Sequence, residues 1–196
     1  LTDVFPTELK SGELRVVEGD VREFFLDAKR QTLNASYKVI ANIPYYITGE
    51  LIRMFLTTAH QPTTIVFLVQ KEVAERIARS KKESLLSLSV KAYGTPRYVR
   101  TVKAGSFNPP PSVDSAILAI EHISRHNFKK ASEEKFFELL HAGFGSKRKT
   151  LMGNLKKEKI RHRMSDFDAE WRKLGLDPKI RAEDVPLEAW LKLAGA

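Results

Sequence analysis

The sequence predicts an α/β domain followed by a small, basic, helical domain. Three observations lead to this prediction. Strand-like and helix-like segments alternate up to about residue 121, as in α/β layer architectures. One strand, at 64–69, is a near-continuous apolar run, which favours burial on both faces of a parallel sheet. Beyond Ser124 only helical patterns remain, so we expect domains at residues 1–123 and 124–196.

The first half of the α/β part contains three predicted strands. Residues 14–18 alternate between apolar and polar side chains and predict a strand that a Gly-Asp turn ends. A second strand at 37–41 runs directly into an Asn-Ile-Pro-Tyr-Tyr segment. Thr48 is placed to cap a helix over 49–58 that carries one apolar stripe. The apolar strand at 64–69 follows, and a helix comes after it.

The second half of the α/β part begins with a helix at 84–93, which a glycine and a proline end. Two late strands, at 98–102 and 115–120, lie on either side of a proline-rich stretch at 107–112. The helical patterns of the second domain are expected to form four helices, at 132–144, 147–157, 165–174 and 183–194.

Composition and charge narrow the class of protein. The 196 residues carry a formal net charge of +9, and such a surface attracts phosphate backbones or anionic lipid. The absence of cysteine excludes disulfides and thiolate metal sites, and the five histidines lack metal-binding spacing, so we expect no metal site. No apolar run approaches about 18 residues, and the first residues lack the features of a signal peptide. We therefore expect a cytoplasmic monomer without a membrane span.

The segment Asn42-Ile43-Pro44-Tyr45 is the sharpest chemical feature of the chain. It follows a predicted strand, where open α/β sheets place a ligand crevice. The amide oxygen of Asn42 and a backbone carbonyl near Pro44 can each accept one N–H of an adenine amino group, which aims the nitrogen lone pair at an electrophilic methyl group. Pro44 fixes the turn, and Tyr45 offers a flat face for a base. A plain strand-to-helix turn is the structural alternative.

Four motifs occur in order along the chain: VIANIPYYITGEL at 39–51, VQKEVA at 69–74, FNPPPSVDSA at 107–116 and FGSKRKTL at 144–151. Each is weak by itself, but together they are highly specific and resemble the ribosomal RNA adenine N6,N6-dimethyltransferases, in particular the small-subunit (16S) enzymes. The resemblance implies a Rossmann-like S-adenosylmethionine-dependent methyltransferase sheet, followed by a small all-helical C-terminal domain.

The resemblance also implies roles for single residues of the base site. Asn42, Pro44 and Tyr45 hold the target amine and its base, and Phe107 stacks on the adenine from the other side. Taken alone, Phe107 is better explained as a core aromatic beside a proline turn. Stacking between two rings offsets the cost of extruding the base, because aromatic stacking returns about 1–3 kcal/mol per base.

The cofactor and RNA contacts follow from the same resemblance. A Gly-Asp-Val segment matches the part of the family that lies against the adenine of the methyl donor, which assigns Asp20 and Val21, with Asn42, to S-adenosylmethionine; an ordinary turn is the alternative. The basic run implies contacts with RNA phosphates, against the alternative of a solvated helix face. The residues assigned to RNA are Lys147, Arg148, Lys149, Lys156 and Lys157, and the run continues through Lys159, Arg161 and Arg163.

The chain departs from the family pattern at the donor site. Family members begin with a strand, a Gly-rich loop and an acidic residue that holds the donor's ribose, whereas this sequence has no Gly-x-Gly-x-x-Gly. Gly143-Phe144-Gly145 is no substitute, because no strand precedes it. We expect a piece of a longer polypeptide whose first strands are missing, which leaves a hydrophobic sheet edge. On its own, the chain is expected to bind S-adenosylmethionine weakly or not at all, and the missing Gly-rich loop can leave this enzyme inactive.

The implied activity is dimethylation of N6 on two adjacent adenosines near the 3′ end of small-subunit rRNA, linked to ribosome biogenesis. A large-subunit (23S) rRNA adenine N6-methyltransferase of the macrolide-resistance type is also compatible with Asn-Ile-Pro-Tyr, although the Val-Asp-Ser-Ala segment and the basic helical tail favour the small-subunit branch. Two further alternatives are a non-catalytic RNA-binding or transcription factor with this fold and a DNA adenine methyltransferase, which explains the proline-rich motif poorly.

Overall fold

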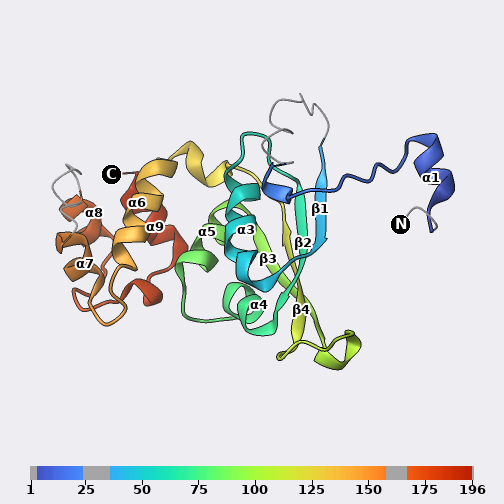
Figure 1. Ribbon diagram of the computed structural model, residues 1–196. Coiled ribbons are helices and arrows are strands. Elements are labelled where there is room, and N and C mark those ends of the chain that lie inside the picture. The colour runs from blue at the N-terminus through green and yellow to red at the C-terminus, as the bar shows by residue number, and fades with distance from the viewer. Residues whose placement is uncertain (1–3, 24–35, 158–166, 196) are drawn as a thin grey trace. The chain divides into compact units, whose positions relative to one another are not determined.

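The computed structural model describes residues 4–23, 36–157 and 167–195 (Figure 1). The chain divides into two compact units, a first unit at Leu1–Ser36 and a second unit at Tyr37–Ala196.

The first unit contains helix α1 (Pro6–Ser11), which has a proline in its first turn and ends at Gly12, where φ is 79°. The strand predicted at 14–18 is wrong, because these residues form no regular structure. The Leu14 N–H donates instead to the Glu8 carbonyl, at 2.9 Å. Alternation of side chains is not sufficient for a strand, since a strand also requires a hydrogen-bonded neighbour.

The second unit is built on a four-stranded sheet with the order β1-β2-β4-β3. Its strands are β1 (Lys38–Asn42), β2 (Thr64–Gln70), β3 (Thr95–Val102) and β4 (Ser115–Glu121). β1 and β2 are parallel, whereas β4 runs antiparallel to both β2 and β3. The predicted α/β class is therefore confirmed.

Helices α3 (Thr48–Thr57), α4 (Lys71–Ala78) and α5 (Leu85–Tyr93) lie along one face of this sheet (Figure 1). Ser84 caps α5 as the first residue of a capping box. The predicted cap of α3 is wrong, because Thr48 is already the first helical residue and its buried hydroxyl has no hydrogen-bond partner among the described residues.

The outer strand β1 is short and partly uncovered. In the described sheet it pairs only with β2, and its side chains alternate between exposed and half-buried. Ile40 is 79% exposed, which is unusual for an isoleucine in a strand next to the core.

The helical part contains α6 (Glu133–Gly143), α7 (Leu151–Lys157), α8 (Phe167–Lys173) and α9 (Leu187–Ala194). These helices share a buried cluster that includes Phe136, Leu140, Leu155 and Trp190, and Leu88 of α5 belongs to the same cluster. A core therefore extends across the domain boundary predicted near Ser124, and that boundary stays a prediction. No helix of the described ranges is long and apolar enough to cross a membrane.

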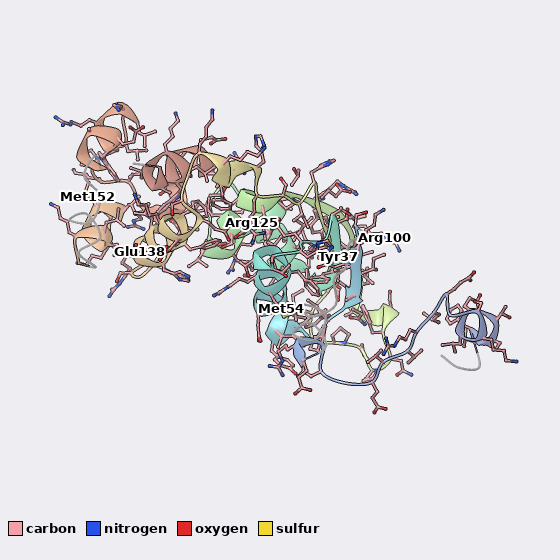
Figure 2. The ribbon with its side chains drawn as sticks, turned by 90° about the horizontal axis from the view of Figure 1, so that it is seen from above. Tyr37, Met54, Arg100, Arg125, Glu138 and Met152 are labelled. Atoms are coloured by element: carbon pink, nitrogen blue, oxygen red, sulfur yellow. The ribbon has the colours of Figure 1, made fainter. Side chains whose placement is uncertain are left out.

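Arg125 joins the α/β part to the helices, and Figure 2 shows it in the middle of the second unit. Its guanidinium donates to the Thr57 and Thr58 carbonyls at the end of α3, at 2.9 and 3.0 Å. It also donates to the Glu133 carboxylate at the start of α6, at 3.0 Å, and Glu133 accepts a second bond from Tyr93 at 2.6 Å. This network satisfies carbonyls that the end of α3 leaves without helical partners.

Candidate functional site

The strand register brings four chain segments to one edge of the sheet. Asn42 pairs with Leu68 where the parallel strands β1 and β2 end. β4 runs in the opposite direction and begins at this edge, with Ser115 opposite Gln70. β3 ends there too, with Val102 opposite Ser115. The turn after Asn42 and the long loop between β3 and β4 therefore leave the sheet at the same edge.

The turn after β1 presents Asn42 at the surface. Asn42 is exposed, whereas the next residue, Ile43, is 6% exposed and packs inward. Pro44 has a φ of −59°, and its carbonyl accepts the Ile47 N–H at 3.2 Å. A carbonyl oxygen has two lone pairs, so this one keeps acceptor capacity for a ligand. The sequence-based roles of Asn42 and Pro44 as acceptors for an amine remain predictions that suit this geometry.

Tyr45 opens the 3-10 turn Tyr45–Ile47, and its hydroxyl lies 2.6 Å from the hydroxyl of Ser115. These residues are 70 positions apart in the sequence. Ser115 is fully buried, whereas Tyr45 is half-buried. The neighbouring Tyr46 is 89% exposed, so it offers a second aromatic surface that the sequence analysis did not single out.

Phe107 follows the 3-10 turn Ala104–Ser106 in the loop between β3 and β4, and it is half-buried. Its N–H donates to the Ala104 carbonyl at 3.2 Å. Asp114, at the far end of the loop, accepts the Ala104 N–H at 3.1 Å and a bond from Lys103 Nζ at 2.9 Å. The loop that carries Phe107 is thus closed by a side chain immediately before β4.

Lys103 and Asp114, at the base of this loop, stabilise each other's charged form. The bond from Lys103 is the main cause that holds the pKa of the Asp114 carboxyl below its usual value, and the Ala104 N–H acts in the same direction. The same bond raises the pKa of Lys103. Asp114 therefore stays ionised, and it acts as an acceptor at neutral pH.

The residues predicted to meet the cofactor's adenine lie in the first unit. Gly19 has a φ of +153°, which side chains rarely adopt, and Asp20 follows it. An open cavity of about 440 Å³ is lined by residues that include Gly19, Asp20 and Val21. The Asp20 carboxylate is already engaged by Arg22, whose backbone N–H donates at 2.8 Å and whose guanidinium donates at 2.5–3.0 Å. These bonds lower the pKa of Asp20 to about 2.

The basic residues predicted to contact RNA surround the turn between α6 and α7. Lys147, Arg148 and Lys149 are exposed in this turn, and Lys156 is exposed on α7. Because Thr150 accepts the Gly153 N–H, α7 begins at Leu151 and not at the predicted residue 147. Lys157 is the last residue of α7, whereas Lys159, Arg161 and Arg163 lie outside the described residues.

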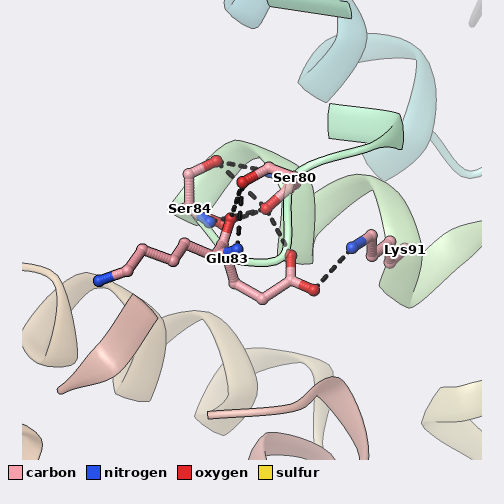
Figure 3. Close-up of polar contacts among 6 residues, drawn as sticks. Ser80, Glu83, Ser84 and Lys91 are labelled. Carbon is pink, nitrogen blue, oxygen red and sulfur yellow. Dashed lines mark hydrogen bonds and ion pairs between the residues drawn. The ribbon is translucent and has the colours of Figure 1, made fainter. Parts of the chain in front are cut away.

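A cavity of about 550 Å³ lies beside this basic turn. The segment between α4 and α5 forms one wall, where Glu83 accepts bonds from Lys91 at 2.6 Å and from Ser87 at 2.7 Å (Figure 3). Apolar and basic side chains both line the cavity, namely Ile77, Leu85, Leu86, Phe144, Arg76, Lys147, Lys149 and Arg181.

Arg181 belongs to this basic surface although the sequence pattern did not indicate it. The pKa of the Glu183 carboxyl is lowered, first by a bond from Lys82 and further by the charges of Arg181 and Lys147. Arg181 and Lys147 therefore lie near the same carboxylate. No local sequence pattern identifies Arg181. Asp114 and Ser115, in contrast, belong to the FNPPPSVDSA motif, which could have pointed to them. In the ranges that the structure describes, no cluster of acidic or histidine side chains could hold a metal ion.

Comparison with known protein families gives one match over nearly the whole chain. Residues 2–195 match the family model described as ribosomal RNA adenine dimethylase.

Curated relatives carry the name ribosomal RNA small subunit methyltransferase A. The protein from Dehalococcoides mccartyi is 42% identical over 161 residues, which cover 82% of this chain and 55% of the relative. The protein from Trichormus variabilis is 40% identical over 166 residues, which cover 80% of this chain and 59% of the relative. The chain thus spans little more than half the length of these relatives.

Two solved structures are similar in fold. A dimethyladenosine transferase from Plasmodium falciparum has a TM-score of 0.71 at 25% sequence identity, and the match covers 98% of this chain and 76% of that one. The 23S rRNA methyltransferase ErmE has a TM-score of 0.65 at 19% identity, over 98% of this chain and 75% of that one, and it shows similarity of fold alone.

Proposed function

Because the chain belongs to the ribosomal RNA adenine dimethylase family, we propose that it dimethylates N6 of two adjacent adenosines near the 3′ end of small-subunit rRNA. This reaction takes place in the cytoplasm during ribosome biogenesis, with S-adenosylmethionine as the methyl donor. The observation that carries the proposal is the convergence of the Asn42 turn and the Phe107 loop at one sheet edge, where a hydrogen bond joins Tyr45 to Ser115. The names of the relatives favour the small subunit over the large one.

Asn42 and the adjacent turn carboxyl-terminal to β1 position the amine. The exocyclic nitrogen of adenine is a weak nucleophile because its lone pair is delocalised into the ring. The Asn42 amide oxygen accepts one N–H and a turn carbonyl near Pro44 accepts the other, which directs the lone pair away from the protein. Positioning of this kind can lower a barrier by about 7–11 kcal/mol. S-adenosylmethionine, when bound, supplies a methyl group on a positively charged sulfur.

Tyr45 and Phe107 hold the base. Both side chains are half-buried, so each combines an anchored part with accessible surface. An adenine leaves its stack at a cost of a few kcal/mol, and contact with aromatic faces returns about 1–3 kcal/mol per base. Contact with the rings of Tyr45 and Phe107 therefore offsets part of the free-energy cost of extruding the adenine.

The Gly19–Asp20 turn is the proposed site for the adenine of the donor, although the Asp20 carboxylate is already hydrogen-bonded to Arg22. The open cavity next to it is large enough for a purine. Three N–H groups of Arg22 donate to the Asp20 carboxylate, namely the backbone N–H, the Nη2–H and the Nε–H, which is shared between both oxygens. The Arg22 side chain is 52% exposed, so it can move into solvent and release Asp20 for an amine.

RNA contacts away from the target base are supported by the basic turn and the cavity beside it. Lys147, Arg148 and Lys149 are exposed cations in one short turn. Asn154 holds this turn by donating to the Gly143 and Ser146 carbonyls, at 2.6 and 3.1 Å. Cations placed in this way attract phosphates and position the enzyme without reading bases.

The test is transfer of labelled methyl groups to small ribosomal subunits that lack the modification. Two polypeptides are assayed, the chain itself and the chain with the family's strand and Gly-rich loop fused before Leu1. We expect N6-dimethyladenosine in the digested rRNA, and its loss in Asn42→Ala. Asn42→Asp, which keeps an acceptor oxygen at the same place, should retain part of the activity. Thermal unfolding of each variant is the control for folding. Because Asn42 is exposed, we expect both variants to unfold at the same temperature as the parent.

Three outcomes contradict the proposal. Methyl transfer only to large subunits would favour the macrolide-resistance branch. RNA binding by both polypeptides without any transfer would favour a non-catalytic RNA-binding protein. Transfer that survives Asn42→Ala at the parental rate would remove the amine-holding role of the turn.

A further inference from the structure

Asp114, immediately before β4, and Ser115, the first residue of β4, contact the two turns that carry the aromatic side chains of the site. Ser115 is held in place from both sides, because it pairs with Gln70 of β2 and with Val102 of β3. It is fully buried, so its hydroxyl has little access to water. A group fixed in this way is a rigid anchor for whatever it binds.

Ser115 anchors Tyr45. The two hydroxyls are 2.6 Å apart, and either can be the donor. A tyrosine ring is set by two side-chain torsions, and a bond at its far end restrains both of them. The bond also crosses from the first segment of the site to the last one, since the two residues are 70 positions apart. The orientation of the Tyr45 ring therefore depends on a residue that is distant in the sequence.

Asp114 anchors the loop of Phe107. Its backbone carbonyl accepts the Lys71 N–H at 3.0 Å, which ties the residue to the start of α4, directly after β2. Its carboxylate accepts the Ala104 N–H at 3.1 Å, and the Ala104 carbonyl in turn accepts the Phe107 N–H at 3.2 Å. Lys103 adds an ion pair at 2.9 Å on the outside, where its own side chain is 76% exposed.

We propose that Asp114 and Ser115 are positioning residues that set the separation and tilt of the Tyr45 and Phe107 rings, and so the slot for the extruded adenine. This inference rests on the proposed function. Neither residue needs to touch the base, because each acts through hydrogen bonds to a neighbouring turn. The sheet therefore fixes the slot, because Ser115 is paired within it and Asp114 directly precedes β4.

The Ser115 part is tested by a double-mutant cycle with Tyr45→Phe and Ser115→Ala. Each change removes the same hydrogen bond from one end, and Tyr45→Phe keeps the ring. We expect kcat for methyl transfer to fall about tenfold in either variant, which corresponds to about 1.4 kcal/mol. The KM for the ribosomal subunit should stay within about twofold, and the double variant should be no slower than either single one.

The Asp114 part uses a conservative rescue. Asp114→Ala removes the acceptor for the Ala104 N–H and should lower kcat by about tenfold. Asp114→Asn keeps an acceptor oxygen and should recover most of the rate. Lys103→Gln breaks only the exposed ion pair and is the matched control, with an expected rate close to that of the parent. A purely structural role would lower the unfolding temperature of Asp114→Ala without this pattern of rates.

A second readout reports the slot without methyl transfer. Rate assays use the more active of the two polypeptides described above, and binding assays use an RNA hairpin with 2-aminopurine at the target position. Extrusion raises the fluorescence of 2-aminopurine, and stacking on aromatic rings quenches it again. We expect weaker quenching in Ser115→Ala and Asp114→Ala at equal RNA occupancy.

The outcomes separate this inference from the proposed function. A parent polypeptide that neither transfers methyl groups nor changes the fluorescence overturns both. A parent that does both, with Ser115→Ala and Asp114→Ala unchanged in kcat and in quenching, overturns the positioning role alone. Additive losses in the Tyr45–Ser115 cycle also overturn it, because they show that the two side chains act independently.

Discussion

Replacement of Gly143 by alanine has two opposite effects on the free energy of unfolding. Alanine favours the helix, but its methyl group overpacks the core. Gly143 is the last residue of α6, and alanine in a helix is favoured over glycine by at most about 1 kcal/mol. A methyl group at Gly143 would lie 2.5 Å from Cη2 of Trp190 and 2.8 Å from Cδ1 of Leu151. Both neighbours are fully buried, and Trp190 is stacked against Phe144 at 6.0 Å between ring centroids. Neither neighbour has room to withdraw.

Overpacking of this kind costs about 1–3 kcal/mol, and two contacts well below van der Waals distance place Gly143→Ala at the upper end. After subtraction of the helix preference, we expect a net loss of about 2 kcal/mol in the free energy of unfolding. For a chain of this length, the loss corresponds to an unfolding temperature lower by about 4–8 °C.

The assay is thermal unfolding followed by circular dichroism, with tryptophan fluorescence as a second probe. Gly49→Ala is the matched control, because Gly49 also lies in a helix and its nearest neighbour, Leu86 Cδ2, is 3.9 Å away. We expect this control to be as stable as the parent or more stable. A Gly143→Ala protein at least as stable as the parent would refute the reasoning, because it would show that the Trp190 environment relaxes freely.

Two further predictions concern charged side chains. Arg125→Met removes the donors to the last carbonyls of α3 and to Glu133, and we expect the free energy of unfolding in urea to fall by about 2 kcal/mol after allowance for partial exposure. Arg97→Met, which breaks an ion pair on a more exposed strand surface, should change it by less than about 1 kcal/mol, and equal effects would contradict the role of Arg125 as a junction. Arg22→Gln should raise the pKa of Asp20 from about 2 towards its ordinary value of 3.8, measured by NMR titration of the carboxyl carbon. Because the pKa of Asp20 is lower in the folded state, the stability that Asp20 contributes is present at a pH above its ordinary pKa of 3.8 and is lost as the pH falls through about 2. An unchanged pKa of Asp20 in Arg22→Gln would contradict the pairing of the two side chains.

Local patterns were sufficient for most elements and for the centre of the site. The helix predicted at 84–93 corresponds closely to α5, because amphipathicity and a glycine at the end of a helix are patterns of neighbouring residues. Similar patterns predicted the positions of β2 and β4, but burial of β2 on both faces of a parallel sheet was wrong, because its alternate residues are only half-buried and its neighbour β4 is antiparallel. The Asn42–Tyr45 turn was also found locally, since a proline after a strand and an exposed amide are features of adjacent residues. Its roles in binding an amine and a base remain predictions.

Patterns failed where the hydrogen bonds of a segment differ from those that its side-chain pattern suggests. Residues 14–18 alternate as a strand does, yet Leu14 bonds to Glu8 and no strand forms. The start of α7 was predicted too early, because a basic helical pattern does not reveal that Thr150 accepts the Gly153 N–H.

The sequence by itself determined the α/β alternation and the basic character of the helical part, and it singled out the Asn42–Tyr45 turn as the predicted site. Only the tertiary structure decided that β4 runs antiparallel beside β2, which places Ser115 against Tyr45 and closes the Phe107 loop on Asp114. Strand order and direction depend on contacts between residues far apart in the chain, and no periodicity within one segment encodes them. Arg181 joined the basic surface for the same reason, since it lies near Lys147 only after the helices have packed.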